Sequence, residues 1–158
     1  MFKKNIIKEE VNYNFLGNCY DFCNYALEVF FKIKSGINTK FSSIRMRQII
    51  INLENEKYIT PNNKLESGQI VVYCKKKEHD DFIVHIGISF EYNKKKYILA
   101  KHGTRGVFVS EEKSFLTVEN NEVEYMKYFD INSLTKKEMN QIILEFLLKT
   151  TFNFKKIE

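Results

Sequence analysis

Apolar residues recur at helical spacing early in the chain. The first helix is predicted to begin after Asn18, which can cap it, and to end before Gly36. Its apolar positions follow one another at intervals of four, three and four residues and are Phe22, Ala26, Val29 and Ile33. Such spacing places them on one face of a helix. We therefore expect this face to pack inside the protein, with Cys19 at its amino-terminal end.

Two later segments also have a helical pattern. One is predicted to follow Ser42 or Ser43, and its inward positions are Met46, Ile50 and Leu53. The other begins at the capping box Thr135-Lys-Lys-Glu138. The positions of this last helix that we expect to be buried are Met139, Ile142, Ile143, Phe146 and Leu147.

The middle of the chain follows a strand pattern. Pro61 and the following "NNKLESG" predict a loop, after which we expect strands at 69–75, 82–91, 96–101, 106–110 and 122–129. The connections between these strands are too short for crossover helices, so the sheet should be largely antiparallel. No repeat or linker divides the 158 residues. The expected structure is one α+β domain, residues 1–158, with helices packed on a five-stranded sheet.

The composition limits the class of protein. Hydrophobic residues make up 44% and charged residues 28%, as in a globular domain. The three cysteines, Cys19, Cys23 and Cys74, are an odd number without paired metal-ligand spacing, so we expect reduced thiols. The start "MFKKNIIKEE" lacks the apolar stretch of a signal peptide, and no run approaches the roughly 18 apolar residues of a membrane span. We expect a chain made in the cytoplasm, with no membrane span.

The net charge of +5 comes partly from lysine clusters, "CKKKEHD" at 74–80 and "NKKKY" at 93–97. Solvated turns explain such clusters. A basic surface also attracts polyanions such as nucleic acid, a cell-wall polymer or an acidic membrane. No nucleic-acid motif accompanies the lysines, so no specific nucleic-acid partner is expected. A non-catalytic module that binds a polyanion is one open interpretation.

Cys19 and His85 are the residues that point to chemistry. A thiol in the first turn of a helix faces unpaired N–H groups and the positive end of the helix dipole, which lower its pKa and can receive an oxyanion. Attack on an amide also needs a histidine to share the thiol proton. His85 lies in "DFIVHIGISF", with Gly87 on its face of the strand. The other face is predicted to hold Phe82, Val84, Ile86, Ile88 and Phe90. Taken singly, a buried core thiol and a structural histidine are the ordinary interpretations.

Four pieces of sequence carry a family resemblance. They are "NCYDF" (18–22), "SGQIVVY" (67–73), "HIGIS" (85–89) and "YILAKHGTRGVFVS" (97–110). Their order resembles that of the NlpC-type cell-wall cysteine peptidases, and "GNC" resembles the start of the related CHAP amidases. The resemblance spans roughly residues 17–110. It implies a papain-like fold, Cys19 as nucleophile, His85 as base, no metal or cofactor, and cleavage of an amide bond in peptidoglycan stem peptides.

The chain departs from this family at two positions. Asp21 stands where a small residue is usual, and Leu99 aligns with the third polar residue of the site. The missing export signal fits a phage lysin, or a toxin carried by a secretion apparatus, with a delivery or immunity protein as a partner. Because the superfamily also resembles deamidases and acyltransferases, an effector that modifies a cellular protein is an alternative function.

Hairpin geometry suggests His102 as the third site residue. If the turn at 92–95 is centred between Asn93 and Lys94, His85 lies directly opposite His102, with Cβ atoms about 4.5–5.5 Å apart. His102 can then orient the ring of His85. A register slip of one residue would turn His102 to the other face and leave a Cys–His dyad. The alternative is that His102 is an exposed residue at the end of a strand.

Two other cysteine and histidine residues are not expected to be catalytic, and a zinc site is left open as an alternative. Cys23 lies one turn deeper in the helix, where the dipole effect has faded, and His79 lies in the charged stretch "KKKEHDD", so neither is expected to act. A zinc site formed by Cys19 and Cys23 with His85 or His102 has suitable ligand types, but no spacing signature supports it.

Overall fold

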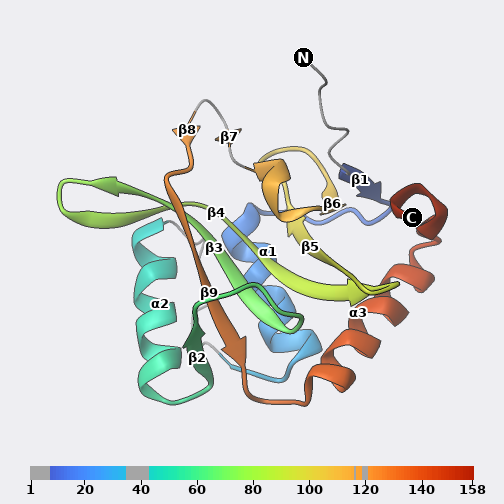
Figure 1. Ribbon diagram of the computed structural model, residues 1–158, viewed down its shortest axis with the longest axis horizontal. Helices are drawn as coiled ribbons and strands as arrows, with labels where there is room; N and C mark the ends of the chain where they lie inside the picture. The colour runs from blue at the N-terminus through green and yellow to red at the C-terminus, as the bar shows by residue number, and fades with distance from the viewer. Residues whose placement is uncertain (1–7, 35–42, 116, 119–120) are drawn as a thin grey trace.

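One antiparallel sheet of seven strands organises the fold, in the order β1-β6-β5-β4-β3-β9-β2 (Figure 1). The computed structural model describes residues 8–34, 43–115, 117–118 and 121–158. The strands of the large sheet are β1 (Lys8–Val11), β2 (Ile59–Asn62), β3 (Gln69–Lys77), β4 (Asp80–Tyr92), β5 (Lys95–Lys101), β6 (Val107–Ser110) and β9 (Tyr125–Ile131). A separate two-stranded ribbon is formed by β7 (Thr117–Val118) and β8 (Asn121–Glu122).

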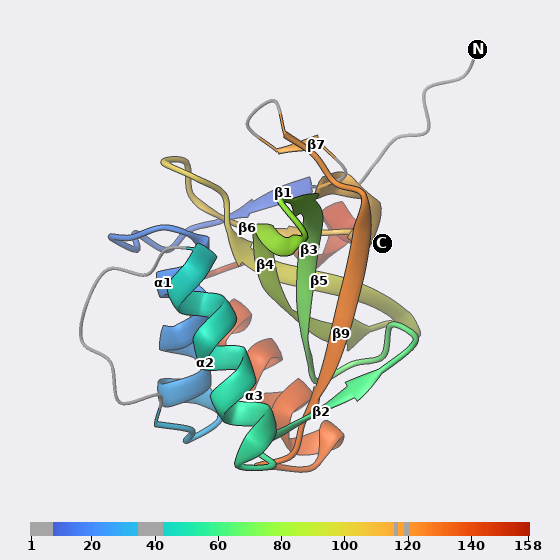
Figure 2. The ribbon, with the colours of Figure 1, turned by 90° about the vertical axis from the view of Figure 1, so that its left-hand side faces the viewer.

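The α-helices of the described residues lie on one side of this sheet (Figure 2). They are α1 (Cys19–Tyr25), which continues as the π-helical turn η1 (Ala26–Phe30), α2 (Ser43–Asn55) and α3 (Lys136–Lys149). Short 3-10 turns are η2 (Glu112–Phe115) and η3 (Phe154–Ile157). None of the helices in the described segments has the length and apolar character needed to cross a bilayer.

Both faces of the sheet are apolar. The main core fills the space between the helices and the sheet, and a smaller cluster covers the other side. On β5, Tyr97 and Leu99 belong to the main core, whereas Ile98 and Ala100 belong to the smaller cluster. This alternation is that of any strand. It defines a helix face, on the side of Tyr97 and Leu99, and an opposite face, on the side of Ile98 and Ala100.

The prediction of an α+β fold is confirmed, but the prediction of five strands in the sheet is wrong. The two additional strands, β1 and β2, lie at the two edges of the sheet. β1 reads KEEV and carries no apolar alternation, and β2 contains Pro61, which the sequence assigns to a loop. Proline is tolerated in an edge strand because one side of the strand makes no ladder hydrogen bonds.

The first helix ends earlier than predicted. Its helical residues stop at Phe30, and Gly36 lies outside the described residues. The prediction that Val29 is buried is wrong, since 45% of it is exposed. The cause is the π-helical turn, in which the N–H of Phe31 donates to the carbonyl of Ala26 at 3.2 Å, five residues back. The wider turn rotates the buried face, so that Leu27 and Phe30 face the core instead.

The other two helices follow the sequence closely. α2 starts at Ser43, with Ser42 outside the described residues, and buries its three predicted inward positions. α3 has the predicted capping box, in which Thr135 Oγ1 accepts from the N–H of Glu138 at 3.1 Å. Three of its predicted core residues are fully buried, whereas Ile142 and Phe146 are partly buried.

A side chain at Gly87 is expected to destabilise the sheet. A Cβ atom there would lie 2.4 Å from Ile98 Cγ2 and 3.1 Å from Ala100 Cβ. Gly87→Ala should therefore lower the free energy of unfolding by about 1–3 kcal/mol, measured by urea denaturation. Gly106→Ala is the matched control, because the atoms nearest to its Cβ belong to the flexible side chain of Glu10. Equal losses in the two variants would contradict the close approach at Gly87.

Candidate active site

Cys19 is the first residue of α1, and a capping box fixes its position. Asn18 Oδ1 accepts from the N–H of Asp21 at 2.9 Å, and Asp21 Oδ2 accepts from the N–H of Asn18 at 2.8 Å. The Asp21 that departs from the family pattern thus has a structural role at this helix start. Cys19 is 8% exposed and belongs to the main core, so it lies on the helix face. α1 packs there against β4 and β5.

Lys101 brings a cation to the segment before Cys19, and the sequence analysis missed it. Its Nζ donates to the carbonyl oxygens of Gly17 at 2.9 Å and Gly103 at 3.0 Å. The residue is buried and, by alternation from Leu99, points to the helix face. A neighbouring cation favours the thiolate form of a cysteine. The sequence contained a signal for this residue, because Lys101 falls at an inward position of the predicted strand 96–101. A lysine at such a position is rarely buried without a partner.

His85 is fully buried at an irregularity in β4. Tyr73 pairs with His85 and Cys74 pairs with Ile83, so Val84 is an extra residue, a β-bulge. The His85 ring lies beside the Tyr73 ring, with centroids 5.6 Å apart. The bulge changes the alternation of the strand, and the prediction that Phe82 and Val84 share a face with Ile86, Ile88 and Phe90 is wrong. Phe82 and Val84 join the smaller cluster, whereas Ile83 joins the main core.

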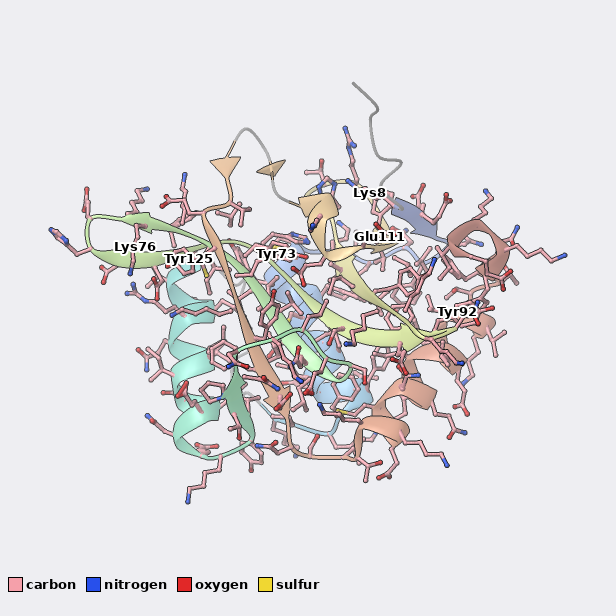
Figure 3. All side chains as sticks on the ribbon, viewed as in Figure 1. Lys8, Tyr73, Lys76, Tyr92, Glu111 and Tyr125 are labelled. Carbon is pink, nitrogen blue, oxygen red and sulfur yellow. The ribbon has the colours of Figure 1, made fainter. Side chains whose placement is uncertain are left out.

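His102 lies beside His85, as the hairpin register predicts. Asn93 and Lys94 have φ values of 52° and 62° and form the two-residue turn, and Ile88 pairs with Leu99. The His85 and His102 ring centroids are 6.0 Å apart, at an interplanar angle of 78°. Lys8 on β1 (Figure 3) places its Nζ 3.1 Å from His102 Nδ1, which must accept because an ammonium group only donates.

The environment of the two histidines keeps both rings neutral at physiological pH. Burial, followed by the charges of His102 and Lys8, lowers the pKa of His85 to about 3. Burial, followed by the charges of Lys8 and Arg105, lowers the pKa of His102 to about 4. A neutral imidazole can accept a proton, but a low pKa makes it a weak base.

The sheet separates the histidines from Cys19. Cys19 packs in the core on the helix face, whereas His85 lies against Tyr73, a member of the cluster on the opposite face. The structure therefore brings the two histidines together and places the thiol on the other side of β4 and β5. Proton transfer between Cys19 and His85 stays a prediction.

The chain matches no family model, no curated protein and no solved structure in the three comparisons made. The candidate site therefore depends on the order of its sequence motifs and on the geometry described above.

The remaining candidates have ordinary structural environments. Cys23 is buried one turn into α1, and burial followed by the charge of Cys19 raises its pKa. His79 is exposed in the turn between β3 and β4, with φ 73°. Within the described ranges, no group of three or more His, Cys, Asp or Glu side chains is placed to hold a metal ion.

Proposed function

We propose that the protein is a cysteine hydrolase that cleaves an amide bond, with Cys19 as nucleophile and peptidoglycan stem peptides as the substrate class. The observation that carries the proposal is the position of Cys19. It opens a capped helix, on the face where the Lys101 side chain reaches the carbonyl of Gly17. The helix N–H groups and the cation both favour a thiolate. The resemblance to NlpC-type peptidases supports the same residue.

The proposed reaction has two steps. The Cys19 thiolate adds to the amide carbonyl carbon, and the positive end of the α1 dipole stabilises the oxyanion. The C–N bond then breaks, and the amine leaves with the proton that the thiol released. His85, oriented by His102, is the predicted carrier of this proton, and it would have to reach the helix face of the sheet to deliver it. Water hydrolyses the resulting thioester and restores the thiol. If an amine replaces this water, the protein is a transferase, and if ammonia is the leaving group, it is a deamidase acting on a cellular protein.

Cys19→Ala is expected to abolish cleavage, whereas Cys23→Ala should retain most of it. The reason is that only Cys19 lies in the first turn of α1, at the positive end of the helix dipole. The measurement is incubation of each protein with purified peptidoglycan, with the products identified by mass spectrometry. Urea denaturation of both variants controls for folding. Loss of cleavage in Cys23→Ala alone would overturn the assignment.

A non-catalytic basic module is the second candidate, and the separation of Cys19 from the histidines favours it. The β3–β4 hairpin projects beyond the rest of the sheet (Figure 1) and carries Lys75, Lys76 and Lys77. The ammonium groups of Lys75 and Lys77 lie 5.5 and 5.1 Å from the ring centroid of Phe82. Alkylation of Cys19 as slow as that of Cys23, together with salt-dependent binding to an anionic cell-wall polymer, would favour this function over hydrolysis.

A further inference from the structure

A polar pocket opens where β1 ends and the turn after β5 passes beside it. Its volume is about 730 Å³, and residues from both segments, including Asn12, Asn14, Arg105 and Phe108, line it. This volume falls in the range of small-molecule sites. The pocket is thus large enough for a ligand of several functional groups.

Two charges of opposite sign share this pocket. Glu10 and Arg105 both line it, and neither forms an ion pair with another side chain in the described part of the chain. Gly106 explains the position of the anion. A Cβ atom at Gly106 would lie 2.6 Å from Glu10 Oε1, so the carboxylate rests against the Gly106 backbone because no side chain is there. The pocket therefore offers one site for a cation and one for an anion.

The other walls suit the part of a ligand between two charged ends. Asn12 and Asn14 carry amide groups that can both donate and accept hydrogen bonds. Phe108 adds an apolar wall, and its ring has Lys8 Nζ 5.1 Å from the centroid. A peptide backbone has the matching amide groups, and its free ends carry an ammonium and a carboxylate.

We propose that this pocket binds a short peptide with free amino and carboxyl ends, the ammonium beside Glu10 and the carboxylate beside Arg105. This inference goes beyond the proposed hydrolysis, since it makes no use of the thiol. Glu10 and Arg105 are exposed, and an exposed ion pair contributes little. Each end of the peptide should therefore change the affinity by about three- to fivefold, and affinity should be weak.

The test uses tri-alanine, N-acetyl-tri-alanine and tri-alanine amide as probes, titrated at pH 7 and low salt against the ¹⁵N-labelled protein. Tri-alanine is expected to shift the backbone amides of Asn12, Asn14 and Gly106. Each capped peptide should bind about three- to fivefold more weakly. The proposal would be overturned if the capped peptides bound as well as tri-alanine. It would also be overturned if no shifts appeared at these amides up to a peptide concentration of about 20 mM, roughly the weakest binding that such contacts allow.

Charge-removing variants assign the two ends. In Glu10→Gln, N-acetylation should no longer weaken binding, whereas amidation still should. Arg105→Gln should show the reverse pattern. Glu9→Gln, which makes the same charge change on the other side of β1, is the matched control and should behave as the wild type. If both pocket variants lose affinity for all three peptides equally, the assignment is wrong. Cys19→Ala should bind the three peptides as the wild type does. The binding test is therefore independent of whether the protein hydrolyses peptidoglycan.

Discussion

Replacing His85 by glutamine is expected to lower turnover on a peptidoglycan fragment by about 10²–10⁴-fold, the usual effect of losing a general base. Glutamine keeps most of the volume of the buried ring and its hydrogen-bonding groups, but it cannot carry a proton. The measurement is kcat by mass spectrometry under saturating substrate. His79→Gln is the matched control, because His79 is exposed in the turn between β3 and β4 and should leave kcat unchanged.

The opposite result has a specific meaning. If His85→Gln keeps turnover within about threefold of wild type while Cys19→Ala is inactive, the base is not His85. The thiol then depends on the helix terminus and on Lys101, which lie on its own side of the sheet. His102→Ala completes the series. An unchanged rate in this variant would remove His102 from the site and leave a Cys–His dyad.

Lowering the pH from about 6.5 to 4 is expected to destabilise the protein through His85. The pKa of its ring is about 3 in the fold and 6.5 in the unfolded chain. Below pH 6.5 the unfolded chain binds a proton that the folded protein does not, so unfolding becomes more favourable as the pH falls. The loss should approach about 1.4 kcal/mol per pH unit and end near pH 3. His102 adds to it in the same direction, down to its pKa of about 4.

Urea denaturation at several pH values between 7 and 4 measures this loss, and His85→Gln should flatten the curve while His79→Gln should not. Asp81 affects the stability of the protein over a lower pH range. Hydrogen bonds from Lys127 and Tyr125 hold the pKa of its carboxyl below the usual value, so its contribution is lost only below about pH 4. Parallel curves for wild type and His85→Gln between pH 6.5 and 4.5 would show that burial of His85 does not control acid stability.

Local features of the structure could be predicted from the sequence. The capping box at Thr135 involves only four neighbouring residues, and the structure forms it. The β4–β5 register depends on a two-residue turn at Asn93 and Lys94, and this turn places His102 beside His85. Both patterns contain all of their interacting partners within a short stretch of chain.

The side of the sheet that the helices cover could not be predicted. From Ile83 to Phe90 every residue of β4 is buried, so polar and apolar positions do not mark an outer face. The bulge at Val84 then reverses the alternation without a glycine or proline to signal it. For these reasons the sequence predicts that Cys19 and His85 meet, whereas the structure places them on different faces. The edge strands were missed because their partners, β6 and β9, are distant in sequence.

Lys101 also has a mechanical consequence. Its one ammonium group holds the carbonyls of Gly17 and Gly103, which are 2.9 and 3.0 Å away, and so joins two loops at the same end of the sheet. One loop leads into the helix that begins at Cys19, and the other leads to Arg105 in the pocket wall. Neither loop can move outward alone without breaking a partly buried hydrogen bond to a charged group. The start of the Cys19 helix and the wall of the pocket are therefore tied to each other through a single ammonium group.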